Sequence, residues 1–287
     1  MLLPADAIVV ALLTPFDGTG AVDRDALGAH VAWLVERGVD GFMPCGTTGE
    51  TALLGDDEVV AVVETVVAAC GARVPVIAHV GRPATQVTIA LGERALAAGG
   101  AAVSAVVPYY YALGADQVFA HYRALLDALG GERVLAYTIP SHAGNGLDAA
   151  TLGRLAEAGM AGLKDSTQSP ELHREYQAAT AGDDGFALLT GTSTLLLEAL
   201  RGGSAGAVLG IANLQPEACV RVRDAHRAGD GAAAEAAQAE LARAQKAVPA
   251  PGVLKQRVAE RLRDEAGLAY APEQRAPLGR AGPFQRG

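Results

Sequence analysis

Short runs of apolar, mostly β-branched residues alternate along the chain with longer segments whose apolar residues recur three and four positions apart. The short runs predict buried strands, and the longer segments predict amphipathic helices. Eight such pairs follow one another with a period of roughly 30 residues, the length expected of a strand–helix–strand repeat. The runs that predict strands cover residues 8–13, 39–44, 74–80, 102–107, 133–137, 160–164, 186–189 and 205–209.

Polar residues and prolines mark the predicted helix starts. Asp23 is placed to cap the first helix, and Asp148 stands before a later one. Pro83 is predicted to open the helix after the third strand, because proline suits a first helical turn. Near the C-terminus, residues 248–252 predict a break between Ala-rich helices and a last helix at 253–266.

Eight repeats predict an α/β fold, a (β/α)8 TIM barrel over residues 1–214. Residues 215–276 are expected to form a C-terminal helical extension, and the Gly/Pro-rich tail at 277–287 is expected to be partly disordered. A doubly wound sheet is the competing architecture. It normally shows G-x-G-x-x-G after the first strand, where this chain has Thr14-Pro-Phe-Asp-Gly18. The pattern therefore favours the closed barrel.

Composition narrows the class of protein. A net charge of −9 argues against nucleic acid or an anionic membrane as the main partner. No apolar run reaches the ~18 residues of a membrane-spanning helix, and Pro4 and Asp6 interrupt the apolar start of the chain. The three cysteines include no C-x-x-C pair, which predicts reduced thiols and neither a disulfide framework nor a metal site. We expect a cytoplasmic protein.

Lysine is rare in this chain, with three residues among 23 basic ones, and Lys164 is the only lysine before position 246. It ends the sixth apolar run. An amine can lose its proton and attack a carbonyl, whereas a guanidinium cannot. On this window alone, a surface lysine after a strand remains the alternative interpretation.

Other polar residues also stand where predicted strands end, the edge at which barrel active sites lie. The turn Gly46-Thr-Thr-Gly-Glu50 follows the second strand and suits a carboxylate, although it could be an ordinary loop. Three tyrosines, 109–111, follow the fourth strand, and Tyr137 ends the fifth, where a core aromatic is the alternative. Together with Lys164 they supply an amine whose neutral form burial favours, a phenol that can pass protons, and a seat for a 2-oxo acid.

These motifs, G-T-T-G-E, P-Y-Y, Y-x-x-P and G-x-K-D, resemble those of the pyruvate-dependent class I aldolases and lyases, over roughly residues 6–215. That family includes N-acetylneuraminate lyase, 4-hydroxy-tetrahydrodipicolinate (dihydrodipicolinate) synthase and the 2-keto-3-deoxy sugar acid aldolases. The resemblance implies that Lys164 forms a covalent imine with pyruvate and that no other cofactor or metal takes part.

The resemblance also assigns roles to other residues. Tyr137 would be the general acid and base, relayed through Thr47 or Thr48 and Tyr110. Thr47 and Thr48 would hold the pyruvate carboxylate, and the carbonyl of Val208 would face the pyruvate methyl group. Because Tyr110 or its neighbour reaches the adjacent subunit's site in this family, a homo-oligomer, dimer or tetramer, is implied.

Departures from the family patterns bear on the second substrate. Dipicolinate synthases usually carry an arginine two residues after the proline of Y-x-x-P, and this chain has His142 there. Sialate lyases usually place carboxylates after Gly191, where this chain has Thr-Ser-Thr. Gly191, His142 and Ser166, which belongs to a Lys-Asp-Ser run similar to sugar-acid aldolases, are assigned to substrate binding. His79 is interpreted as a hydrogen-bonded residue of the barrel interior, and Cys45 as packing.

The leading hypothesis is a Schiff-base lyase that releases or adds pyruvate, acting on a 2-keto-3-deoxy sugar acid or a related aldehyde adduct. The alternatives are a 4-hydroxy-tetrahydrodipicolinate synthase or a 2-oxo acid dehydratase of the same family. A non-catalytic homologue that binds a 2-oxo acid is the alternative of another class.

Overall fold

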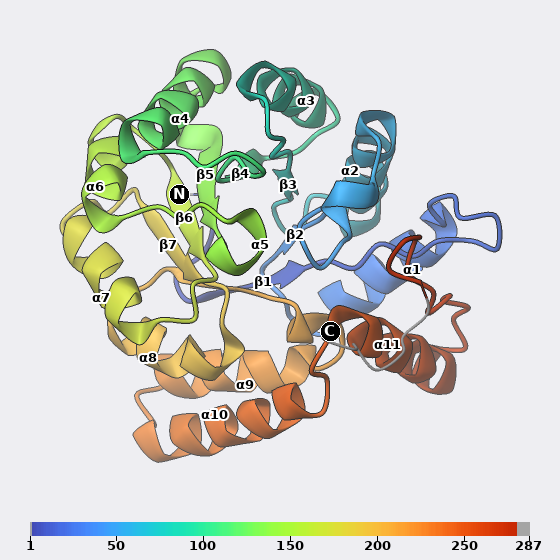
Figure 1. Ribbon diagram of the computed structural model, residues 1–287. Helices are drawn as coiled ribbons and strands as arrows, with labels where there is room; N and C mark the ends of the chain where they lie inside the picture. Colours follow the sequence, from blue (N-terminus) through green and yellow to red (C-terminus); the bar gives the residue numbers. More distant parts are fainter. Residues whose placement is uncertain (1, 280–287) are drawn as a thin grey trace, which may run out of the picture.

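A computed structural model describes residues 2–279 of the chain. In this part, eight parallel strands form a barrel surrounded by helices, so the predicted (β/α)8 fold is confirmed (Figure 1). The strands run in the order β2-β1-β8-β7-β6-β5-β4-β3, and a parallel bridge between Phe42 and Val76 closes the ring between β2 and β3. Their bounds are β1 Ala7–Ala11, β2 Gly41–Met43, β3 Ile77–His79, β4 Ala102–Val106, β5 Val134–Thr138, β6 Gly162–Asp165, β7 Ala187–Thr190 and β8 Gly206–Leu209.

Helices surround the strands, and within residues 2–279 three more follow the last strand in the sequence. Their bounds are α1 Arg24–Val35, α2 Asp56–Cys70, α3 Thr85–Ala97, α4 Ala115–Leu129, α5 Pro140–Ala143, α6 Ala149–Glu157, α7 Pro170–Ala179, α8 Leu196–Arg201, α9 Pro216–Arg227, α10 Gly231–Lys246 and α11 Pro251–Ala266. Short 3-10 turns stand at 51–53, 131–133, 193–195 and 211–213.

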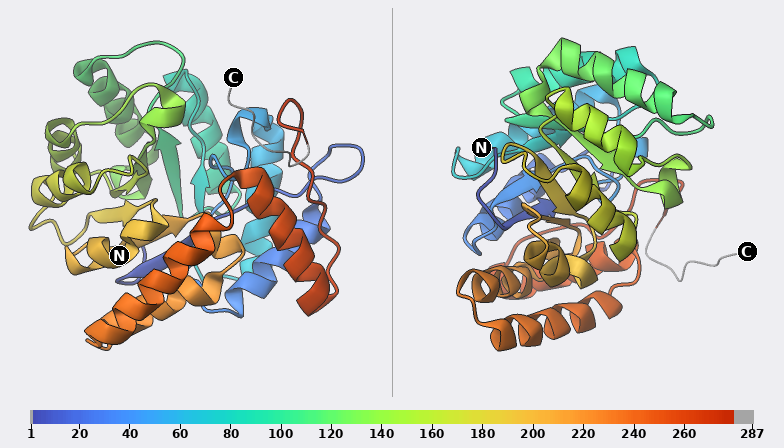
Figure 2. Two further views of the ribbon diagram at one scale, coloured as in Figure 1. Left: turned by 60° about the horizontal axis from the view of Figure 1, so that its bottom comes forward. Right: turned by 90° about the vertical axis from the view of Figure 1, so that its left-hand side faces the viewer.

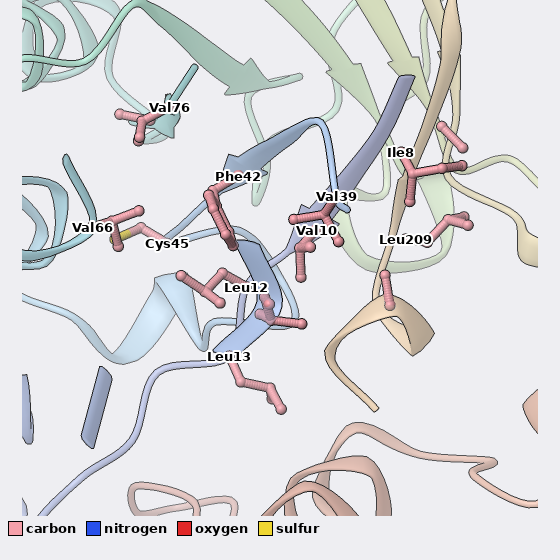
Figure 3. Close-up of a cluster of buried hydrophobic side chains, with 14 of the residues drawn as sticks. Ile8, Val10, Leu12, Leu13, Val39, Phe42, Cys45, Val66, Val76 and Leu209 are labelled. Carbon is pink, nitrogen blue, oxygen red and sulfur yellow. The ribbon is translucent and has the colours of Figure 1, made fainter. Parts of the chain in front are cut away.

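Side chains on each strand alternate between the barrel interior and the surrounding helices, because successive residues of a strand point to opposite faces. One buried cluster fills the interior and includes Val9, Met43 and Leu135. A second packs the outer face of the strands against the helices and includes Ile8, Val10 and Phe42, as Figure 3 shows for part of it. Both faces are therefore apolar, which explains why the strand segments read as continuous apolar runs.

The C-terminal helices cover one side of the barrel. Helices α9 and α10 pack against each other, and α11 lies beside α1 (Figures 1 and 2). An ion pair of 3.2 Å joins Arg37, two residues beyond α1, to Glu265 of α11. The guanidinium of Arg261 lies 4.9 Å from the centroid of the Trp33 ring. The extension is thus bonded to the first helix of the barrel and packs as part of the same body.

Two predicted helix starts are confirmed and two are wrong. Asp23 and Asp148 cap α1 and α6 through their carboxylates. Helix α3 begins at Thr85 instead of Pro83, because the Thr88 hydroxyl holds the backbone of Arg82 in a closed turn first. Helix α11 begins at Pro251, two residues early, since proline is well placed in a first turn.

Two further expectations concern disorder of the C-terminal tail and the absence of a membrane-spanning helix. Most of the tail expected to be disordered, residues 280–287, lies outside the described residues. Among the helices that are described, none is long and apolar enough to cross a membrane.

Candidate active site

The amine of Lys164 and the ring of Tyr137 lie side by side at the carboxyl end of the barrel. The two residues are direct partners in the register between β5 and β6, so both side chains point to the interior. Lys164 is 4% exposed and Tyr137 is 2% exposed. The Lys164 Nζ atom lies 4.2 Å from the centroid of the Tyr137 ring, within the range of a cation–π contact. The sequence thus places an amine and a phenol together in a buried position.

The turn after β2 reaches this pair. The Thr47 Oγ1 atom lies 3.2 Å from the Tyr137 Oη atom, a hydrogen bond in which either hydroxyl can donate. Thr48 lines a cavity of about 200 Å³ at the barrel mouth, which Gly191 and Leu254 also line. The phenol therefore contacts both the amine of Lys164 and the hydroxyl of Thr47, and the next residue, Thr48, borders the cavity.

Three more predicted site residues lie on neighbouring strands and loops. Val208 is buried on β8, with its side chain in the interior cluster. Gly191 follows β7 and lies against Ser166, which follows β6: a Cβ atom on Gly191 would stand 2.0 Å from the Ser166 hydroxyl. Only a glycine allows this close approach of the two loops, so Gly191 keeps the rim of the site narrow.

Two predicted site residues are not brought to the pair within one chain. His142 is exposed on α5, where its ring bonds the neighbouring Ser141 hydroxyl at 3.0 Å. Tyr110 is 86% exposed, with a positive φ of 84°, and its ring contacts Tyr111. Within this chain the hydroxyl of Tyr137 is thus bonded to Thr47, and Tyr110 is presented outward.

His79 lies inside the barrel, as predicted, but the expectation that it is hydrogen-bonded is wrong. Among the described residues, neither ring nitrogen has a hydrogen-bond partner, and the ring meets Tyr137 edge to face at 5.7 Å. Burial, with a smaller effect of the nearby Lys164 and Arg82 cations, lowers the pKa of His79 to about 3. The imidazole is therefore neutral at physiological pH and buttresses the phenol ring.

Asp165 follows Lys164 directly but points to the other side of β6. Its carboxylate accepts hydrogen bonds from the Thr167 backbone at 2.8 Å and from His173 at 2.8 Å, and the other nitrogen of His173 lies 2.9 Å from the Ser204 hydroxyl. An Asp–His–Ser chain of this kind suggests a hydrolase, yet all three side chains are buried. These hydrogen bonds instead fasten α7 and the segment before β8 to β6, the strand that carries Lys164.

Comparisons with known proteins agree with this site. The model of the dihydrodipicolinate synthetase family matches residues 4–282. The chain belongs to this family. A 4-hydroxy-tetrahydrodipicolinate synthase from Acidiphilium cryptum is 36% identical over 234 residues, covering 81% of this chain and 79% of that protein. An uncharacterised DapA-like lyase from Halobacterium salinarum is 38% identical over 235 residues, covering 82% and 76% of the two chains.

Solved structures of the dihydrodipicolinate synthetase family share the fold. The dihydrodipicolinate synthase of Aquifex aeolicus superposes with a TM-score of 0.87 at 26% identity, over 97% of this chain and 93% of that one. The E. coli K12 prophage protein YagE, solved with pyruvate, gives 0.89 at 24% identity over 97% and 94% of the chains, a likeness of fold alone. The chain is accordingly a pyruvate-dependent carbon–carbon lyase, of a family that uses a lysine imine without a metal or another cofactor.

Sequence reasoning missed the residues that hold the turn at 46–50 from outside the barrel. Glu50 closes that turn and forms a buried ion pair with Lys255 of α11. Scarcity of lysine was the available signal, since two of the three lysines prove to be buried, Lys164 and Lys255. Cys45, interpreted as packing, is buried in the outer cluster, and burial raises the pKa of its thiol to about 12.

Buried neutral histidines predict that acid destabilises the fold. Burial lowers the pKa of His30 to about 4 and that of His79 to about 3. Below pH ~6.5 the unfolded chain binds these protons while the folded chain does not, so the free energy of unfolding falls as pH falls. Each histidine contributes a slope of about 1.4 kcal/mol per pH unit.

Urea unfolding of the wild type and of His79→Phe at pH 7, 6 and 5 measures this contribution. We expect the variant to lose about 1.4 kcal/mol less per pH unit than the wild type below pH 6.5. Parallel pH dependences of the two proteins would show that His79 is not held neutral by the fold.

Proposed function

We propose that Lys164 is the residue that forms the imine with pyruvate and that Tyr137 is its proton carrier. The observation that supports this assignment is the buried contact of the two side chains, with the Tyr137 hydroxyl bonded to Thr47. A buried lysine amine beside a phenol suits a nucleophile, because it can add to a carbonyl that is held against it. The Tyr137 ring contacts the amine, so its hydroxyl is a candidate to exchange protons with groups bound there.

Thr47 and Thr48 hold the carboxylate of pyruvate at the turn, and the amine adds to the C2 carbonyl. Tyr137 gives a proton to the carbonyl oxygen as the carbinolamine forms, and that oxygen leaves as water when the imine forms. Loss of a methyl proton from the imine gives an enamine, whose carbon attacks the carbonyl carbon of an aldehyde. Hydrolysis of the imine then releases the product, and the same steps in reverse cleave a 2-oxo acid.

Reduction with borohydride tests the nucleophile. Incubation with pyruvate and borohydride is expected to add one reduced pyruvyl group to the peptide that contains Lys164, as measured by mass spectrometry. Lys164→Ala should abolish the label, and Lys246→Ala, at an exposed lysine of α10, should leave it unchanged. A label that survives in Lys164→Ala would overturn the assignment.

Two aldehydes are candidates for the second substrate, each favoured by a different observation. Relatives named 4-hydroxy-tetrahydrodipicolinate synthase favour aspartate semialdehyde, the aldehyde that such synthases condense with pyruvate. His142 favours a neutral, sugar-derived aldehyde, because it stands where dipicolinate synthases usually carry an arginine for the carboxylate of the second substrate. A buried carboxylate without a cation is costly.

A kinetic comparison decides between the two aldehydes. If the natural substrate is a neutral aldehyde, we expect kcat/KM with aspartate semialdehyde to be lower than with a neutral hydroxyaldehyde. His142→Arg should then raise it on the order of tenfold or more, the effect of one charge-assisted hydrogen bond. A wild type that already turns over aspartate semialdehyde faster than any neutral aldehyde would support the synthase assignment.

We also propose a homo-oligomer in which Tyr110 completes the site of a second copy. Asn145 holds the loop that carries Tyr110. Its side-chain NH2 donates to the carbonyls of Pro108 and Tyr111, both at 2.7 Å, and its side-chain oxygen accepts from the backbone N–H of Leu113. A rigid loop that exposes a tyrosine at positive φ suits insertion into another subunit.

Mixing two inactive variants tests this arrangement. Tyr110→Ala and Lys164→Ala homo-oligomers should each be inactive or nearly so, and subunit exchange between them should restore activity, since mixed sites then hold both residues. Sedimentation velocity should show a dimer or tetramer. A monomer, or mixtures without recovered activity, would contradict the proposal.

A further inference from the structure

The turn that carries Thr47 and Thr48 is bounded by two residues in an unusual backbone conformation. Cys45 has a φ of 60° and Glu50 a φ of 64°, the left-handed region that side-chain-bearing residues seldom adopt. Within the turn, the Glu50 backbone donates to the Thr47 carbonyl at 3.2 Å. Such a turn keeps its shape only when surrounding contacts impose it.

Glu50 supplies those contacts through both oxygens of its carboxylate. Oε1 accepts from the Lys255 amine at 2.8 Å, and Oε2 accepts from the backbone N–H of Arg275 at 2.9 Å. The two side chains of the ion pair are 0% and 2% exposed. Both donors come from the end of the chain, more than 200 residues away, so the C-terminal helix and the segment after it hold the turn from outside the barrel.

The donors are themselves fixed in place. Lys255 lies 4.3 Å from the centroid of the Phe16 ring, and the Arg275 guanidinium lies 4.4 Å from the same centroid. The Arg275 guanidinium also donates to both oxygens of Glu58, on α2, at 2.6 and 2.7 Å. Burial lowers the pKa of Lys255, and the bond to Glu50 opposes that shift. The pair is therefore a packed unit and not a surface contact that thermal motion would average away.

We propose that Lys255 is a positioning residue for pyruvate: through Glu50 it fixes the turn whose hydroxyls receive the carboxylate of the 2-oxo acid. The inference rests on the proposed function. Without the Lys255 cation, the buried Glu50 carboxylate loses one of its two donors and is left with an uncompensated charge. That loss lets the Glu50 end of the turn shift, which moves Thr47 relative to Tyr137.

The experiment measures how much pyruvate is needed to trap Lys164. For Lys255→Met, we expect the pyruvate concentration for half-maximal borohydride trapping to rise on the order of tenfold, the effect of losing one charge-assisted hydrogen bond. Trapping at saturating pyruvate should remain complete, because Lys255 does not touch the reacting atoms. Lys246→Met, at the remaining lysine, is the matched control and should trap like the wild type.

A second variant separates positioning from stability, since Lys255→Met leaves a buried charge that could prevent folding. The double variant Glu50→Gln, Lys255→Met removes both charges, and a neutral pair of similar size is expected to fold. The proposal expects its half-maximal pyruvate concentration to stay raised even where its Tm equals that of the wild type. Lys255→Arg, which keeps a cation, should lie nearer the wild type.

The two proposals fail in different ways. If the wild type is not labelled at Lys164, the proposed function fails. If the wild type is labelled and the double variant traps pyruvate at the wild-type concentration, only the positioning role of Lys255 is overturned, and the ion pair acts in stability alone.

Discussion

Alternation of side chains along parallel strands is the constraint from which this site arises. Tyr137 and Lys164 are register partners on β5 and β6, so they share a face and come into contact. A slip of one residue on either strand would turn that side chain into the apolar layer beneath the helices. The barrel prevents such a slip because its interior and exterior are both packed, and each face specifies the register independently.

The same alternation separates two charges that are neighbours in the sequence. Asp165 directly follows Lys164 in the sequence. Because the two point to opposite faces of β6, the Asp165 carboxylate is bonded to Thr167 and His173 on the helix side. On the interior side the amine instead meets an aromatic ring and a neutral imidazole. Asp165 thus anchors β6 to the helix side, and its neighbour Lys164 is available for chemistry on the interior side.

Local signals in the sequence predicted the barrel, its strands and the residues at the strand ends, because periodicity and end position decide those features. Lys164, Tyr137 and Thr47 come together as predicted for that reason. Contacts between distant segments left no local signal: nothing near Glu50 indicates a partner 205 residues away. Helix starts such as Pro83 failed where a side-chain bond to the backbone competed with the helix.

Lysine and arginine have different roles in this chain because their side chains differ in chemistry. Arginines form the surface ion pairs, where a planar guanidinium can bond several oxygens and stays hydrated. The two buried lysines, Lys164 and Lys255, instead present a single amine to the groups around them. At Lys164 the proposed attack on a carbonyl requires an amine, which can lose its proton. At Lys255 the amine places one donor 2.8 Å from a carboxylate oxygen of Glu50, beside the Phe16 ring. One lysine is thus suited to reaction and the other to support, and the turn from Glu50 to Thr47 is the physical link between them.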